Sequence, residues 1–295
     1  MENSISVVEG RTLHEISLQR KLWADLTAAS LDFCEDLLQW SSCGNVAVTD
    51  TDLDRVVDRV LYMYVSEPLA YWLTGWFALA CMNLLLQGKR DIEVFVFGAG
   101  PVAEAAILSL DHGAAHRILC VSVLSRHGIS NQMLAAKLAS KVHFKLDAVK
   151  DRTRLHRAGF VITATDAGAP LFEPHEISRN AVTLSLGIDD MPAEYFEMLF
   201  SQGGLAVGDD LVAMEARNVD PLSLYYSRRG LKLTEHGRAD GVKNYSEILS
   251  DATLMERLKN WKGPASFLPV GLASLDVAVA AKIYEMLSIT LSTKE

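Results

Sequence analysis

The residues with the clearest chemical meaning form a glycine turn within EVFVFGAGPVAEAA at positions 93–106. An apolar run enters Gly-x-Gly-x-x-Ala and an alanine-rich stretch leaves it, which predicts a strand, a tight turn and a helix. Gly98 permits the turn, Gly100 lets the backbone approach a pyrophosphate, and the small Ala103 allows close helix–strand packing. Unpaired N–H groups at the helix start would face the phosphates. We therefore expect dinucleotide contacts at Gly98, Ala99, Gly100, Pro101 and Val102; a purely structural turn is the alternative.

The end of the second predicted strand, 118–124, bears on which dinucleotide would bind. An acidic residue there hydrogen-bonds the ribose 2′-hydroxyl, whereas an arginine accommodates a 2′-phosphate. This chain has Ser125, Arg126 and His127 at that place, with neither Asp nor Glu. The sequence therefore favours NADPH over NADH, with an ordinary loop role for Arg126 and His127 as the alternative.

Two further segments place polar residues directly after apolar runs. Val-Ile-Thr-Ala-Thr-Asp at 161–166 and Thr-Leu-Ser-Leu-Gly-Ile-Asp-Asp at 183–190 would end at the same edge of a parallel sheet as the glycine turn. We expect cofactor contacts from Thr163, Ala164, Thr165, Leu186 and Gly187. Asp189 is a candidate for proton relay or for stabilising an iminium charge, and a helix cap is its alternative role. Asp209 and Asp210 are interpreted as a capping pair.

The elements that would position these residues alternate along the middle of the chain. Apolar runs predict strands at 93–97, 118–124, 144–146, 159–163, 181–186 and 204–207, with helices at 101–110 and 131–140. This alternation predicts an α/β fold with a doubly wound parallel sheet of Rossmann type. Residues 209–264 read as mostly helical. The remaining expected elements are a strand at 5–9 and helices at 13–40, 50–64, 67–86 and 274–289.

Composition and charge exclude several classes of partner. A net charge of −9 with no basic run argues against nucleic-acid binding. The apolar stretch 69–86 contains Thr74, Gly75 and Asn83, which predicts a buried helix that does not span a membrane. The four cysteines lack metal-ligand spacing, and Cys81 and Cys120 lie in apolar patterns. Since no signal-peptide pattern opens the chain, we expect a cytoplasmic protein without a metal site.

Taken together, four segments resemble the ornithine cyclodeaminase/mu-crystallin family. They are the glycine turn 98–103, Val-Ile-Thr-Ala-Thr at 161–165, Gly-Ile-Asp at 187–189 and Val-Gly-Leu-Ala-Ser-Leu-Asp at 270–276. The resemblance implies a Rossmann domain at 73–271, and a smaller substrate and dimerisation domain formed by 1–72 with 272–295. It also implies cofactor contacts at Val270 and Gly271. A homodimer is expected, because the apolar segment 61–65 is more than a monomer needs to expose.

The chain departs from the family pattern where substrate and phosphate contacts are expected. Leu73-Thr74 replaces an Arg-Thr pair, Leu268-Pro269 replaces Lys-Ser, and 191–194 replaces a Pro-Gly-Lys-like stretch. The N-terminal region shows no obvious β-rich sheet and no matched cation for an amino-acid carboxylate. The resemblance implies an NAD(P)H-dependent reductase of a small amino-acid-derived imine or ketimine. A cyclodeaminase of an ornithine-like amino acid, and a non-catalytic dinucleotide or small-ligand binding protein, are the alternatives.

Overall fold

The computed structural model describes residues 38–40, 45–48, 62–64, 67–259 and 261–270. The chain divides into two compact units, Met1–Leu73 with Gly271–Glu295, and Thr74–Val270. The expected strand at 5–9 and helix at 274–289 lie outside the described residues, as does Gly271. The roles of the first unit in substrate binding and dimerisation stay predictions.

The first unit contains a three-stranded antiparallel sheet that the sequence did not lead us to expect. Its strands are β1 Leu38–Trp40, β2 Asn45–Val48 and β3 Tyr62–Tyr64, in the order β1-β2-β3. The helices expected at 13–40 and 50–64 are therefore wrong at their final residues. In both segments, Leu-Gln-Trp and Tyr-Met-Tyr, the first and third residues are large and apolar or aromatic, and the middle residue is of another type. This alternation suits a pleated strand, in which successive side chains point to opposite faces. The inference that this region lacks a sheet is also wrong.

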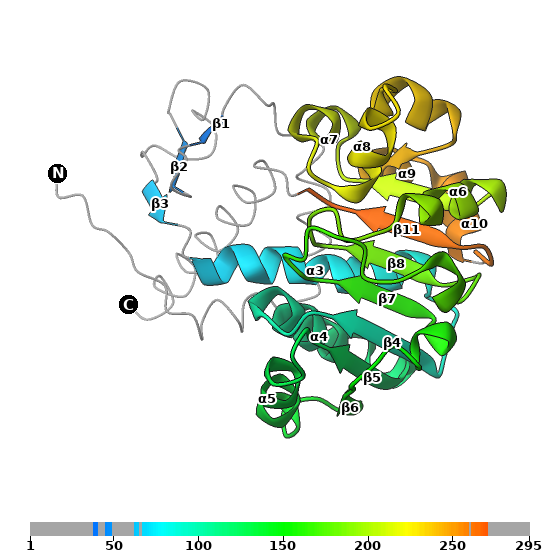
Figure 1. Cartoon of the computed structure of the whole chain (residues 1–295). Coiled ribbons are helices and arrows are strands. Elements are labelled where there is room, and N and C mark those ends of the chain that lie inside the picture. Colours follow the sequence, from blue (N-terminus) through cyan, green and yellow to red (C-terminus); the bar gives the residue numbers. More distant parts are fainter. Residues whose placement is uncertain (1–37, 41–44, 49–61, 65–66, 260, 271–295) are drawn as a thin grey trace, which may run out of the picture. The chain divides into compact units, whose positions relative to one another are not determined.

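The second unit is built on a fully parallel sheet of eight strands, ordered β10-β9-β11-β8-β7-β4-β5-β6. Figure 1 labels the part of this order that runs from β11 to β6. All six strands expected between 93 and 207 are present. The strands at 243–244 and 265–268 were not predicted. The second of these, 265–268, lies inside the sheet between β8 and β9. The strands are β4 Ile92–Phe97, β5 Ile118–Leu124, β6 Lys145–Ala148, β7 Phe160–Thr163, β8 Val182–Ser185, β9 Leu205–Gly208, β10 Lys243–Asn244 and β11 Ala265–Leu268.

Helices connect these strands, and the two helices predicted between 101 and 140 are confirmed. Short 3-10 turns lie at Ala115–Arg117, Leu155–Arg157 and Pro174–Glu176, and a π-helical turn lies at Leu233–Gly237. The α-helices are α3 Glu67–Leu85, α4 Pro101–Ala114, α5 Ser130–Leu138, α6 Ala193–Ser201, α7 Leu211–Arg217, α8 Pro221–Ser227, α9 Tyr245–Ser250 and α10 Ala252–Lys259.

Both faces of the sheet are covered. Phe97 and Phe267 point to opposite faces, because Phe97 is in register with Thr163 and Ser185, whereas Phe267 is in register with Leu184. On one face the Phe97 ring contacts Phe172, which contacts Tyr195 of α6. On the other face Phe267 contacts Phe77 of α3. This three-layer α/β/α arrangement confirms the predicted fold class.

Helix α3 fulfils the expectation of a buried apolar helix. A Cβ atom added at Gly75 would lie 2.5 Å from the Ala105 Cβ and 2.6 Å from the Ala106 nitrogen, so the glycine allows α3 and α4 to touch. Cys81 of the same helix is buried, and burial raises the pKa of its thiol, while Cys120 in β5 is partly exposed. Among the described residues, no helix has the length and apolar character needed to cross a membrane.

Candidate active site

The predicted cofactor segments meet at the carboxyl edge of the large sheet. From β4 the chain moves outward through β5 and β6, and it then returns to β7 on the other side of β4. This reversal of strand order opens a crevice where doubly wound sheets bind ligands. The Ala164 N–H donates to the Phe97 carbonyl at 2.8 Å, and the Leu186 N–H donates to the Thr163 carbonyl at 2.7 Å. The loops after β4, β7 and β8 therefore start side by side.

Gly98 and Gly100, the two glycines of the turn after β4, differ in what a side chain at each position would contact. Gly98 has φ of 104°, and a Cβ there would overlap the Ala164 carbonyl oxygen. Gly100 has φ of −85° and precedes α4 as its N-cap, yet nothing lies within 4 Å of the position its Cβ would take. The fold thus requires glycine at 98, whereas at 100 glycine leaves open space above the start of α4. That space, next to helix N–H groups with no side-chain cap, fits a pyrophosphate.

The end of β5 presents Arg126 and His127 to solvent. The preceding Ser125 hydroxyl donates to the Asn131 side-chain oxygen at 3.1 Å. The buried Asn131 amide in turn donates to the carbonyls of Val123 at 3.0 Å and Val149 at 2.9 Å, which fixes the ends of β5 and β6. Arg126 and His127 are exposed and make no hydrogen bond or ion pair with any described residue. The end of β5 thus presents a cation that has no partner within the part of the chain that the structure describes.

The loops after β7 and β8 are in close contact. A Cβ at Gly187 would lie 2.6 Å from the Thr165 carbonyl oxygen and would overlap a carboxylate oxygen of Asp190. Glycine at 187 therefore lets the two loops pack together. With the contact between Gly98 and Ala164, this makes a continuous path of backbone from the glycine turn to the acidic pair at 189–190. Thr163 lies beneath this path, fully buried.

Asp190 is the residue that sequence reasoning missed. It is fully buried, and its carboxylate accepts hydrogen bonds from the Ser185 hydroxyl at 3.2 Å and the Thr165 hydroxyl at 3.5 Å. It thereby joins the ends of β7 and β8. Burial raises the pKa of Asp190 to about 6, against the lowering effect of the neighbouring hydroxyls. The apolar Met191-Pro192 that follows, and the hydroxyl residues at both strand ends, were the available signals for a buried acid.

The raised pKa of Asp190 predicts how stability changes with pH. Its ordinary pKa is 3.8, so from about pH 4 to pH 6 the folded state binds the proton more tightly than the unfolded state. This tighter binding adds about 3 kcal/mol to the free energy of unfolding below pH 4, and the contribution is lost as pH rises to about 6. Urea titrations of the wild type and Asp190→Asn at pH 4, 5, 6 and 8 measure it. As pH rises to about 6, the free energy of unfolding of the wild type should fall relative to that of the variant. A difference between the two proteins that does not change with pH would contradict the raised pKa of Asp190.

Asp189 adopts a different role from its neighbour. It has a left-handed backbone, with φ of 51°, and its carboxylate pairs with both terminal nitrogens of Arg228 at 2.8 and 2.6 Å. Helix α6 begins later, with Pro192 as its N-cap, so the interpretation of Asp189 as a helix cap is wrong. The left-handed turn separates Asp189 from the start of the helix and directs it to α8.

The two acids of the second pair, Asp209 and Asp210, also have different roles. Asp210 caps α7 by accepting from the N–H groups of Val212 at 2.8 Å and Ala213 at 3.1 Å, as predicted. Asp209 is buried and accepts from the Val270 N–H at 2.9 Å. The expected capping role therefore holds for Asp210 alone. Asp209 instead fixes Val270, which follows β11 at the carboxyl edge of the sheet.

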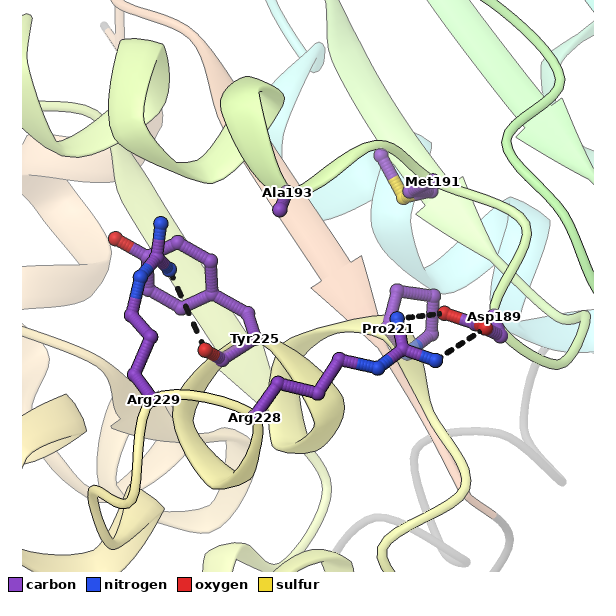
Figure 2. Close-up of a pocket in the computed structure, with 7 residues that line it drawn as sticks. All are labelled: Asp189, Met191, Ala193, Pro221, Tyr225, Arg228 and Arg229. Atoms are coloured by element: carbon purple, nitrogen blue, oxygen red, sulfur yellow. Dashed lines mark hydrogen bonds and ion pairs between the residues drawn. The ribbon is translucent and has the colours of Figure 1, made fainter.

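A pocket of about 220 Å³ opens beside Asp189. Figure 2 shows Arg228 reaching across it to Asp189, with Arg229 lying over the Tyr225 ring on the other side. The Arg229 guanidinium is 3.7 Å from the ring centroid and pairs with Glu197. The pocket thus combines a charged rim with apolar walls. It is lined by Asp189, Met191, Ala193, Pro221, Tyr225, Arg228 and Arg229.

Within the part of the chain that the structure describes, no group of three or more His, Cys, Asp or Glu side chains is arranged to hold a metal ion. The geometry suits a phosphate-bearing ligand at the glycine turn and a small, partly polar molecule in the pocket.

Comparison with solved structures finds the same fold in several enzymes. A probable ornithine cyclodeaminase from Bordetella pertussis Tohama I has a TM-score of 0.71 at 15% identity, over 97% of this chain and 98% of that one. Iminosuccinate reductase of Paracoccus denitrificans, solved with NAD⁺, has a TM-score of 0.62 at 14% identity, over 96% and 94%. Thermococcus litoralis Δ1-pyrroline-2-carboxylate reductase, solved with NADH and L-proline, has 0.60 at 16%, over 82% and 70%.

These similarities confirm the fold that the resemblance to the ornithine cyclodeaminase/mu-crystallin family implies. Neither a protein-family model nor a curated protein sequence matches the chain. With identities near 15%, the likeness establishes how the chain is folded. What it binds and converts has to be argued from its own residues.

Proposed function

We propose that the protein is an NAD(P)H-dependent reductase of a small imine or ketimine derived from an amino acid. The observation that carries the proposal is the open space at Gly100, above the start of α4 and at the reversal of strand order. The loops after β7 and β8 start beside this turn, and the loop after β8 contains Asp189, which lines the pocket. The solved structures with the same fold include two named as reductases and solved in complex with a nicotinamide dinucleotide. That pairing of fold and cofactor supports the proposal.

The residues divide the work between binding and proton transfer. When bound, the cofactor supplies a hydride for the carbon of the C=N bond. The turn 98–102 would hold the pyrophosphate, and Ala164, Thr165, Leu186 and Gly187 would border the dinucleotide along the carboxyl edge of the sheet. Asp189, at the rim of the pocket, would hold the proton that the imine nitrogen needs. Positioning of imine and cofactor in one crevice would supply much of the remaining rate enhancement.

NADPH is the cofactor that the end of β5 favours. Arg126 is exposed and free of partners among the described residues, so it can donate to a 2′-phosphate without breaking another interaction. Arg126→Ala should weaken NADPH binding by about 1–3 kcal/mol and leave NADH binding nearly unchanged. Fluorescence titration of both cofactors measures this, with His116→Ala as a control outside the strand end. A wild-type protein that binds NADH more tightly would contradict the assignment.

A cyclodeaminase is the second candidate, supported by the match to the probable ornithine cyclodeaminase over nearly the whole chain. In that case the cofactor would be reduced and reoxidised within one turnover. A binding protein without turnover is the third. The protein should be incubated with NADPH and a panel of cyclic imines and ketimines, and separately with NAD⁺ and ornithine or lysine. Stoichiometric NADPH loss supports the reductase, ammonia release on catalytic NAD⁺ supports the cyclodeaminase, and cofactor binding with neither supports the binding protein.

A further inference from the structure

The ion pair between Arg228 and Asp189 has the geometry of carboxylate recognition. Two terminal nitrogens of one guanidinium bind the two oxygens of one carboxylate, at 2.8 and 2.6 Å. The Arg228 side chain is 60% exposed, and the Asp189 side chain is 20% exposed. A pair at the rim of a pocket, with its cation largely in water, contributes little to stability and is easily opened.

The pair also conflicts with the role proposed for Asp189. Both oxygens of its carboxylate are engaged by the Arg228 guanidinium, at 2.8 and 2.6 Å, so they cannot contact the imine nitrogen of a ligand at the same time. Asp189 becomes available to a ligand only after Arg228 has moved to another anion. Glu197, which lies on the Arg229 side of the pocket, is already paired with Arg229. Among the described residues that line the pocket, Asp189 is the one carboxylate, so we expect the competing anion to arrive with the ligand.

We propose that Arg228 binds the carboxylate of the substrate and that Asp189 occupies this position until the substrate arrives. The inference rests on the proposed reductase function and assigns the residue that would hold the substrate, an imine that carries a carboxylate next to the C=N carbon. The substrate carboxylate replaces that of Asp189 on the guanidinium, which leaves the Asp189 side chain free to face the imine nitrogen. Overall, the imine would take up a hydride at carbon and one proton at nitrogen, which keeps the electron pair of the C=N π bond, so that imine, NADPH and one proton give amine and NADP⁺.

The remaining pocket residues suit such a molecule. Met191, Ala193 and Pro221 supply apolar surface for the carbon skeleton of the ligand. Arg229 is less available as a carboxylate ligand, because it is engaged by Glu197, by the Tyr225 ring and by the Tyr225 carbonyl at 3.3 Å. Of the two arginines at the pocket, Arg228 is the one that has no side-chain partner except Asp189 among the described residues, so it can exchange one carboxylate for another. This arrangement places a cation for the substrate carboxylate within the unit Thr74–Val270.

The test compares two substrates that differ only in the carboxylate, 1-pyrroline-2-carboxylate and 1-pyrroline, each reduced with NADPH. Arg228→Gln should raise KM for 1-pyrroline-2-carboxylate by roughly 10–100-fold and change the kinetics on 1-pyrroline far less. Arg228→Lys should recover part of the loss, since it keeps the charge without the two-pronged geometry. Arg238→Gln is the matched control, because Arg238 is a similarly exposed arginine paired with Glu247 at 2.7 Å outside the pocket.

A second measurement keeps the inference testable apart from turnover. L-proline binding to the NADPH-loaded protein, followed by calorimetry, should be lost in Arg228→Gln and retained in Arg238→Gln. Equal effects of Arg228→Gln on both imines, or no effect on either, would overturn the role of Arg228. If the wild type reduces neither imine, the proposed function fails, and L-proline binding then decides the inference alone. A wild type that does not bind L-proline either would overturn both.

Discussion

Replacing Asp189 by Asn is expected to lower turnover by roughly 10²–10⁴-fold, the usual effect of removing a general acid. The variant should fold normally, because φ at 189 is 51° and Asn adopts the left-handed conformation as readily as Asp. Cofactor affinity should change little, since Asp189 pairs with Arg228 and lies in the pocket beyond the cofactor loops. Steady-state kinetics with NADPH and 1-pyrroline-2-carboxylate measure the loss.

The same variant carries a second signature that a structural role would not produce. Asn cannot compete as an anion for Arg228, so KM for the carboxylate-bearing imine should fall while kcat falls with it. Normal turnover in a folded Asp189→Asn protein would leave proton delivery to water. A fall in thermal stability with unchanged kinetics would assign the ion pair a structural role instead.

Replacing Gly100 by Val is expected to weaken NADPH binding by at least roughly 100-fold, because the new side chain would fill the space assigned to the pyrophosphate. The backbone there has ordinary dihedral angles, with φ of −85°, and no protein atom lies within 4 Å of the added Cβ. The fold should therefore survive, with a loss of about 1 kcal/mol from poorer capping of α4. Fluorescence titration gives the affinity, and circular dichroism the stability.

Gly98→Ala is the matched comparison two residues earlier. Its Cβ would overlap the Ala164 carbonyl oxygen, and its φ of 104° is unsuited to alanine. The main effect of this variant should therefore be a loss of folding stability. Comparing Gly98→Ala with Gly100→Val separates a glycine that the fold requires from a glycine that ligand binding requires. Unchanged NADPH affinity in folded Gly100→Val would remove the cofactor from this turn and favour the purely structural interpretation.

The sequence predicted what depends on local pattern. Apolar runs of four to seven residues between glycines and helix starts placed β4, β5, β7 and β8 nearly to the residue, and the same runs located the loops at their ends. A parallel sheet brings such ends to one edge whatever the intervening sequence does. The fold and the meeting of the cofactor segments could therefore be predicted, whereas the roles of individual residues in those segments stay proposals.

Features that depend on contacts distant in sequence could not be predicted in this way. The four-residue strand β11 joins the middle of the sheet only because β8 and β9 leave a place between them. Asp189 and Asp190 are neighbours with the same chemistry, and a left-handed turn at 189 sends one to the rim and the other into the core. Arg228 reaches Asp189 across 39 residues of chain, a separation that no local pattern reveals.

Hydride transfer to an imine is the central claim, and isotope transfer tests it most directly. The protein should be incubated with 1-pyrroline-2-carboxylate and NADPH that carries deuterium at C4 of the nicotinamide, in separate reactions with the two C4 epimers. The account predicts that one epimer gives proline with a single deuterium at the carbon that bore the C=N bond, and that the other gives unlabelled proline. Proline without deuterium from either epimer, or no proline at all with a cofactor that binds, would contradict it.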